Sequence, residues 1–207
     1  MIRLKMVLSL LLGSLLLVSV AQAADKKGNY AAKGLGILTC AQLDDASKKN
    51  PEKLKLMFHT YLGGYLTAFN QLKKGTFDIL PWQNTENFGV LVSNYCTNNP
   101  DLQLVLALGR MTKAFESARL TRSTELVKIS EGDDFVWIYK TVIWRAQKAL
   151  KDRGYYKWNP DALFGPGTRK AFKGFQKDND LKVTGLPDQI TLFKLLLYKA
   201  EENKQAE

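Results

Sequence analysis

Residues 147–176 read QKALKDRGYYKWNPDALFGPGTRKAFKGFQ and carry the most specific pattern of the chain. An apolar face at helical spacing ends at Gly154, and a glycine there is typical of a helix C-terminus in the left-handed conformation. An aromatic turn follows at residues 155–160. Gly165 and Pro166 then begin a second helix, because proline suits the first helical position. The stretch therefore predicts two helices joined by an aromatic turn.

The residues on either side extend this unit. Apolar residues at helical spacing from Phe135 onwards place the start of the first helix upstream. Apolar residues within 190–197 predict a third helix. The sequences at the starts of the second and third helices are similar, because segments 164–168 and 185–191 each contain a glycine, a proline and a threonine. We therefore predict a small three-helix unit over residues 137–199, with a weak internal duplication.

This unit resembles the three-helix peptidoglycan-binding domain found on many cell-wall hydrolases. The resemblance covers about residues 139–198. It rests on residue types in a fixed order: Gln147, Leu150, Gly154, Tyr155, Asp161, Phe164, Gly165, Pro166, Thr168, Ala171, Phe172, Phe175, Gln176, Val183, Thr184, Gly185 and Thr191. Ala162 and Asp180 depart from it, because the family usually has glycine at both positions. The resemblance implies a bundle of three helices with peptidoglycan as its ligand.

The charge and the aromatic residues of the unit suit peptidoglycan physically. Residues 139–199 contain thirteen Lys or Arg and five Asp, a local charge of about +8. Cations such as Arg169 and Lys170 could pair with carboxylates of the peptide stems, and exposed tyrosine or tryptophan rings suit a wet binding rim. For each single residue, the alternative is packing in the core or a place on a solvated basic face. The candidate ligand-binding residues are Tyr155, Tyr156, Trp158, Arg169 and Gln176.

The start of the chain predicts a secretory signal peptide over residues 1–23. Cationic residues precede the apolar run 6–20, and Ala21-Gln22-Ala23 forms a small-x-small cleavage site. We expect cleavage after Ala23, with an uncleaved membrane anchor as the alternative, and no other stretch is long and apolar enough to span a bilayer. The expected location is the periplasm of a Gram-negative-type cell. Although the net charge of +10 would also suit nucleic acid, export argues against that partner.

A helical bundle is predicted over residues 37–115. Thr39 and Gln42 match a capping box at the start of a short helix. Asn50-Pro51 suits the start of a long helix, because asparagine caps well and proline fits the first turn. A third helix follows, and Asn99-Pro100 is expected to open a fourth.

Cys40 and Cys96 are the two cysteines of the chain. An even count in an exported protein favours a disulfide, which would contribute roughly 4 kcal/mol on the chain-entropy model. The sequence around them, over about residues 35–115, resembles the HdeA/HdeB-type periplasmic acid-stress proteins through the segments TCAQ, YLGGYLTAFNQ and YCTNNPDLQL. That resemblance implies a helical periplasmic bundle with one disulfide and a link to stress response.

Three further segments are expected to contain little regular structure. Residues 24–36 are polar and contain glycines, as in a flexible arm, and residues 200–207 form a charged tail. Residues 116–136 are interpreted as a polar linker, in which 126–129 could instead form a short strand. The expected fold is therefore all-α, with two small helical bundles joined by a polar linker.

The sequence contains no pattern typical of a catalytic centre. His59 is the single histidine, and oxidised cysteines supply neither a nucleophile nor a metal site. The neighbouring acids Asp44-Asp45 and Asp133-Asp134 point in different directions, which does not suit a pair of catalytic carboxylates. We therefore predict that the protein is not an enzyme and uses no metal or cofactor.

These observations predict a non-enzymatic periplasmic protein that binds peptidoglycan and anchors an HdeA-like helical domain at the cell wall. One alternative is a wall-tethered acid-stress chaperone, whose client-binding surface would open when carboxylates are protonated. Another is a targeting cofactor of a cell-wall hydrolase. Apolar-dye binding at neutral and acid pH would test the first alternative, and co-purification with a hydrolase would test the second.

Overall fold

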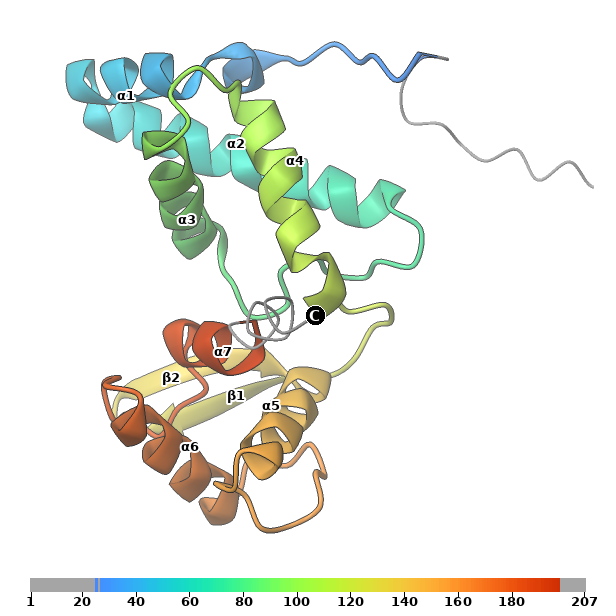
Figure 1. The fold of residues 1–207 in the computed structure, drawn as a ribbon, viewed down its shortest axis with the longest axis vertical. Coiled ribbons are helices and arrows are strands. Elements are labelled where there is room, and N and C mark those ends of the chain that lie inside the picture. Colours follow the sequence, from blue (N-terminus) through green and yellow to red (C-terminus); the bar gives the residue numbers. More distant parts are fainter. Residues whose placement is uncertain (1–24, 26, 198–207) are drawn as a thin grey trace, which may run out of the picture. The chain divides into compact units, whose positions relative to one another are not determined.

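The structure is a computed structural model that describes Asp25 and residues 27–197 (Figure 1). The chain divides into two units, Met1–Ala31 and Ala32–Glu207. All the helices and strands described below belong to the second unit.

Two predicted segments lie outside the described residues, namely the signal peptide at 1–23 and the charged tail at 200–207. Cleavage after Ala23 therefore stays a prediction. Within the described part of the chain, no helix is both long enough and apolar enough to cross a membrane.

The first two helices begin at the predicted caps. Helix α1 (Cys40–Lys49) starts with the capping box: the Thr39 hydroxyl accepts a hydrogen bond from the Gln42 backbone N–H at 3.2 Å, and the Gln42 side chain accepts one from the Thr39 N–H at 2.9 Å. Helix α2 (Pro51–Leu72) has proline in its first turn, and Asn50 caps it. Both caps satisfy backbone donors that have no partner inside the helix.

Part of the segment expected to form a flexible arm, 24–36, is structured. The 3-10 helix η1 (Gly34–Ile37) buries Leu35, which packs in the core of the helical region. The residues that follow η1 are also tied down, because the carbonyl of Leu38 accepts a hydrogen bond from the Leu104 N–H at 2.9 Å.

The fourth helix starts later than predicted. Helix α3 (Thr85–Thr97) is followed by a turn, and α4 (Leu104–Phe115) begins several residues after Asn99-Pro100. The carbonyls of Pro100 and Leu102 accept hydrogen bonds from the first N–H groups of α1. These contacts hold residues 99–103 outside a helix, because a helix there would turn the same carbonyls away from α1.

The predicted disulfide between Cys40 and Cys96 is confirmed. It joins the start of α1 to the end of α3, with the two Cα atoms 5.1 Å apart. A hydrophobic core lies within this helical region, and its fully buried members include Leu62, Ile79, Phe88, Val92, Leu104 and Leu108.

The segment expected to be a linker contains a β-hairpin instead. After the short 3-10 helix η2 (Glu116–Ala118), β1 (Leu126–Glu131) pairs antiparallel with β2 (Asp134–Tyr139) around a turn at Gly132, where φ is 59°. The stretch from Phe135 is therefore a strand and not the start of a helix. Alternating β-branched and aromatic residues favour this strand, and its inner side chains pack on the following helix. The described part of the chain is mostly helical, with one two-stranded sheet.

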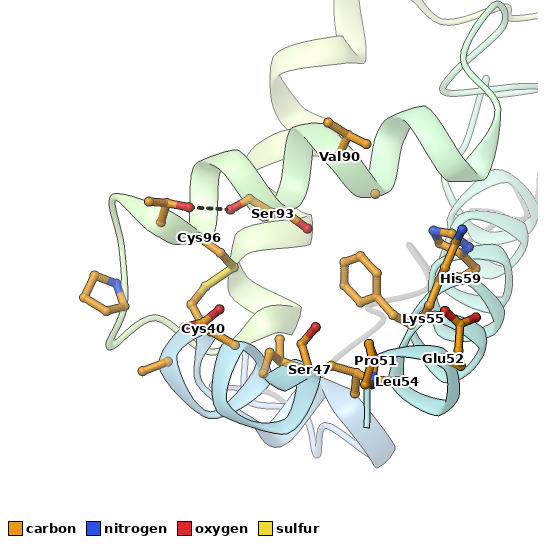
Figure 2. Close-up of a pocket in the computed structure, with 17 residues that line it drawn as sticks. Cys40, Ser47, Pro51, Glu52, Leu54, Lys55, His59, Val90, Ser93 and Cys96 are labelled. Atoms are coloured by element: carbon orange, nitrogen blue, oxygen red, sulfur yellow. Dashed lines mark hydrogen bonds between the residues drawn. A yellow bond between two sulfur atoms is a disulfide. The ribbon is translucent and has the colours of Figure 1, made fainter. Parts of the chain in front are cut away.

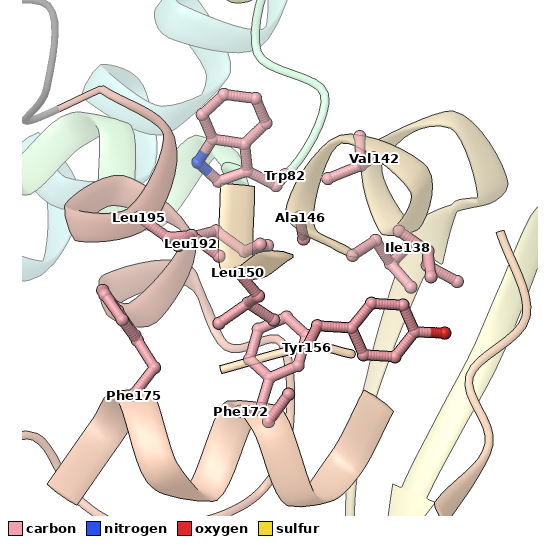
Figure 3. Close-up of a cluster of buried hydrophobic side chains, with 12 residues drawn as sticks. Trp82, Ile138, Val142, Ala146, Leu150, Tyr156, Phe172, Phe175, Leu192 and Leu195 are labelled. Carbon is pink, nitrogen blue, oxygen red and sulfur yellow. The ribbon is translucent and has the colours of Figure 1, made fainter. Parts of the chain in front are cut away.

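Up to residue 197, three helices follow the hairpin: α5 (Lys140–Asp152), α6 (Pro166–Asp178) and α7 (Gln189–Leu196). The predicted features at their ends are confirmed, because Gly154 has a φ of 82° after α5 and Pro166 lies in the first turn of α6. The helices enclose a second core (Figure 3). Its members are Trp82, Ile138, Val142, Ile143, Ala146, Leu150, Tyr156, Ala171, Phe172, Phe175, Leu192 and Leu195.

Trp82 is the unexpected member of this core. It comes from the loop between α2 and α3, yet it packs with side chains of the three-helix unit (Figure 3). Phe193 on α7 packs in turn against the first core, with its ring 6.4 Å from that of Phe115. The two helical groups are therefore connected by side-chain packing as well as by the chain.

Ala162 offers a direct test of backbone strain in the three-helix unit. Its φ of 61° is in the left-handed region, which costs a residue with a Cβ about 1–2 kcal/mol. Glycine at this position would remove the strain, but it also gives the unfolded chain more conformational freedom, which offsets part of the gain in stability. We therefore expect Ala162→Gly to raise the free energy of unfolding by up to about 1 kcal/mol in urea denaturation.

Two other variants serve as controls for this strain. Asp180 also has a positive φ, of 55°, but aspartate tolerates this conformation better than alanine does. Asp180→Gly should therefore raise the free energy of unfolding by less than Ala162→Gly does. Ala149 lies within α5, so Ala149→Gly should lower the free energy of unfolding by about 1 kcal/mol. An Ala162→Gly protein that is less stable than the wild type would rule out strain at this turn.

Candidate functional site

Two buried glutamines organise the loops of the three-helix unit. The side-chain oxygen of Gln147 on α5 accepts hydrogen bonds from the backbone N–H groups of Asp161 and Ala162, at 3.0 and 2.9 Å. Its nitrogen lies 2.8 Å from an Asp161 carboxylate oxygen and 3.0 Å from the Thr168 hydroxyl in the first turns of α6. Gln147 therefore fixes the loop before α6 and the start of that helix.

Gln176 repeats this arrangement one helix later. Its oxygen accepts a hydrogen bond from the Gly185 N–H at 2.8 Å, and its nitrogen lies 3.0 Å from the Thr191 hydroxyl at the start of α7. The side chain has no exposed surface. Gln176 was predicted to bind the ligand, but its amide is enclosed and holds the loop before α7. The internal duplication therefore consists of two glutamine-centred hydrogen-bond networks.

The two tyrosines predicted for the binding rim are positioned differently from each other. Tyr156 is only 6 % exposed and belongs to the core, so its predicted place on an exposed rim is wrong. Tyr155 is half-buried: its ring meets Phe175 edge-on at 5.6 Å, and its hydroxyl donates to the Asp178 carboxylate at 3.1 Å. Burial, together with this hydrogen bond, raises the pKa of Tyr155.

Trp158 is the most exposed of the five candidates, with 57 % of its surface accessible. Its six-membered ring lies against Gly167 in the first turn of α6, where an added Cβ would come within 2.7 Å of the indole. The absence of a side chain at Gly167 therefore allows the indole to rest on the helix start. This places an exposed aromatic face beside the first turn of α6.

A basic hollow of about 420 Å³ lies along α6. We call it the α6 hollow, and it is lined by Phe164, Gly165, Pro166, Arg169, Lys170 and Lys173. The three cations repeat at helical spacing, so they share one face of the helix. Of the predicted site residues, Arg169 is the one that lines this hollow.

A carboxylate of the hairpin binds to two of these cations. Glu131 on β1 lies 3.0 Å from the Arg169 guanidinium and 2.8 Å from the Lys173 ammonium. The hydrogen bond from Lys173, followed by the charge of Arg169, lowers the pKa of Glu131 below its ordinary value of 4.5. The guanidinium also donates to the Ser130 carbonyl at 2.8 Å and lies 5.2 Å from the centre of the Phe164 ring. Two of the three cations that line the α6 hollow are therefore already paired with a carboxylate of the protein.

Lys170 differs from its two basic neighbours. It is exposed and makes no hydrogen bond or ion pair with the residues that the structure describes. Its ammonium is therefore the cation of the α6 hollow that is most readily available to an external carboxylate.

Glu131 and Lys173 were not among the predicted site residues. The hairpin that brings Glu131 to α6 was interpreted as a linker, although alternating residues on both sides of Gly132 would have indicated two strands. Lys173 lies two turns into α6, and its place in the hollow follows from the helical spacing of 166, 169, 170 and 173.

Comparison with known protein families identifies the region around these features. Residues 143–195 match the family described as "Putative peptidoglycan binding domain". The matched region includes the α6 hollow and both buried glutamines, while the hairpin precedes it. No curated protein and no solved structure matches the chain. The HdeA/HdeB-type resemblance of residues 37–115 therefore stays a prediction.

A second, larger cavity of about 710 Å³ lies in the helical region that precedes the matched residues (Figure 2). Apolar side chains of α1, α2 and α3 line it, and the Cys40–Cys96 disulfide forms part of its wall. His59 and Lys55 lie at this cavity with Glu52. Nowhere in the described residues do three or more His, Cys, Asp or Glu side chains gather as metal ligands.

Proposed function

We propose that the chain is a non-enzymatic periplasmic protein whose residues 143–195 bind peptidoglycan and so anchor the helical region 37–115 at the cell wall. The observation that carries this proposal is the family match, because it coincides with the folded three-helix unit and its α6 hollow.

The charges of the α6 hollow suit the peptide stems of peptidoglycan, which end in carboxylates. Hydrogen bonds between a cation and a carboxylate are stronger than those between neutral groups. Glu131 supports this chemistry, because its carboxylate already bridges Arg169 and Lys173. Lys170 then supplies the cation for a stem carboxylate, and the exposed ring of Trp158 stands beside the same helix start.

We expect Lys170→Ala to weaken the binding of the full chain to purified sacculi about threefold, which is the scale of one exposed ion pair. Co-sedimentation across a range of sacculus concentrations measures this change. Lys177→Ala is the matched control, since it also removes an exposed cation from α6 but lies outside the hollow.

Two results would count against this assignment. If the wild-type chain does not sediment with sacculi, peptidoglycan binding itself is wrong. If Lys170→Ala and Lys177→Ala weaken binding equally, overall charge and not the α6 hollow recognises the wall.

The same proposal extends to the helical region. Once anchored, it would present a surface to a client protein, as an acid-stress chaperone does, or to a cell-wall hydrolase that needs targeting. The cavity beside the disulfide supports this extension, because both apolar and charged side chains line it. Comparing dye binding by the full chain at neutral and acid pH, and testing co-purification with hydrolases, separates these two roles.

A further inference from the structure

The hairpin presents two large aromatic rings on its outer face. Phe135 and Trp137 are 52 % and 58 % exposed. They alternate along β2, so their side chains stand on one face about 7 Å apart. Lys128 pairs with Trp137 in the register of the strands, and its ammonium lies 4.0 Å from the centre of the Phe135 ring. We call Phe135, Trp137 and Lys128 the aromatic platform.

Packing of the hairpin does not account for this platform. Most core contacts of the sheet come from the opposite face, through Val127, Ile129 and Ile138, while on the platform side Tyr139 at the end of β2 also packs against the core. A sheet that packs on one side normally places polar residues on the other side. Adjacent large apolar residues left on a surface mark an interaction site more often than scattered single ones do.

The position of the hairpin points to the ligand. Strand β2 ends at Tyr139, and α5 begins at the next residue, so the platform leads directly into the matched region. The same hairpin contacts the α6 hollow through Ser130 and Glu131. The hairpin therefore connects the two surfaces: Glu131, on the face of Val127 and Ile129, contacts the cations of α6, and Phe135 and Trp137 stand on the other face.

The chemistry of the platform complements that of the α6 hollow. Peptidoglycan combines charged peptide stems with a polymer of sugar rings, whose C–H faces are apolar and whose edges carry hydroxyl and acetamido oxygens. Flat aromatic faces suit the ring faces, and an adjacent ammonium suits the oxygens. Because Lys128 lies over Phe135, Trp137 offers the larger free face.

We propose that the aromatic platform binds the glycan strand of peptidoglycan, with a sugar ring stacked on Trp137 and Lys128 hydrogen-bonded to sugar oxygens. This inference rests on the proposed function and assigns the sugar polymer to a surface outside residues 143–195. The stem peptides and the glycan strand are thus recognised by different surfaces, the α6 hollow and the hairpin.

The test uses the full chain with two probes, namely purified sacculi and a soluble N-acetylglucosamine oligomer that has sugars but no peptide. We expect the wild type to bind both, and Trp137→Ala to weaken both interactions at least fivefold. Trp137→Phe retains a ring and should keep part of the affinity. Trp144→Ala removes an exposed tryptophan of α5 that is not on the hairpin, and it should leave both interactions unchanged.

The outcomes separate this inference from the proposed function. Lys170→Ala should weaken binding to sacculi while leaving oligomer binding intact. If the wild type binds sacculi but not the oligomer, or if Trp137→Ala binds both as the wild type does, the platform does not bind glycan and the proposed function still stands. If Trp137→Ala instead abolishes self-association in analytical ultracentrifugation without altering oligomer binding, the platform is a contact between copies, and the inference is overturned. If the wild type binds neither probe, both proposals are overturned.

Discussion

Replacing Trp82 with alanine should lower the free energy of unfolding by about 3–5 kcal/mol, the range measured when a large aromatic residue is removed from a core. Trp82 is 7 % exposed and packs among the core side chains of α5, α6 and α7. The loop that carries it is held in place, because the Asn70 side chain accepts a hydrogen bond from the Ile79 N–H at 2.9 Å. The loop is therefore poorly able to collapse into the space that the indole leaves.

Urea denaturation of the full chain measures this loss of stability. Two further variants serve as controls. Trp82→Phe should lose much less than Trp82→Ala, because it keeps most of the apolar volume and the indole N–H has no hydrogen-bond partner among the described residues. Trp158→Ala removes an exposed indole and should change stability by less than about 1 kcal/mol. Equal losses for Trp82→Ala and Trp158→Ala would show that Trp82 is not part of the second core.

The double variant Cys40→Ser with Cys96→Ser should lose about 4 kcal/mol of stability on the chain-entropy model. The disulfide closes a loop between residues 56 positions apart, so its removal gives the unfolded chain many more conformations. The unfolded chain also becomes less compact, and the slope of unfolding against denaturant should therefore rise.

Reductant provides the internal control for the disulfide. Adding it to the wild type should reproduce the loss, while the double variant should not respond to it. Cys40→Ser alone should behave like the double variant, since either change removes the same cross-link. A double variant with the denaturation midpoint of the wild type would show that the cross-link contributes nothing to stability.

The elements that could be predicted are those governed by neighbouring residues. Thr39 with Gln42, Asn50-Pro51 and Gly165-Pro166 each mark a helix start where the structure has one, because a cap depends on side chains within one turn of the helix. Gly154 likewise marks the end of α5. The start of α4 could not be found this way, because contacts between residues 99–103 and α1 decide it.

The hairpin was missed for a related reason. Residues from Phe135 onwards contain apolar side chains that fit a helical face and a strand about equally well over a short range. Pairing with β1 decides between the two, and β1 itself contains polar residues that indicate a linker. Tertiary packing then makes the strand the more favourable choice, because it turns Val127 and Ile138 toward the core.

The candidate site also has features that the sequence predicts and features that only the tertiary structure decides. Composition and the order of residues are enough to predict a basic three-helix unit that resembles a peptidoglycan-binding domain, and the match at 143–195 agrees. They do not show which side chains face solvent. Tyr156 and Gln176 are polar enough for a rim but are buried, because the Tyr156 ring packs in the second core and the Gln176 amide is bound to the loop before α7.

By itself, the sequence determined where α1, α2 and α6 begin, which cysteines pair and which region matches a peptidoglycan-binding family, since caps, cysteine count and family patterns depend on residue identity and short spacing. Tertiary structure alone decided that Trp82 completes the second core and that Glu131 reaches Arg169 and Lys173. It also decided that Phe135 and Trp137 face outward. Each of these depends on contacts between segments distant in the chain, which no local pattern of residues specifies.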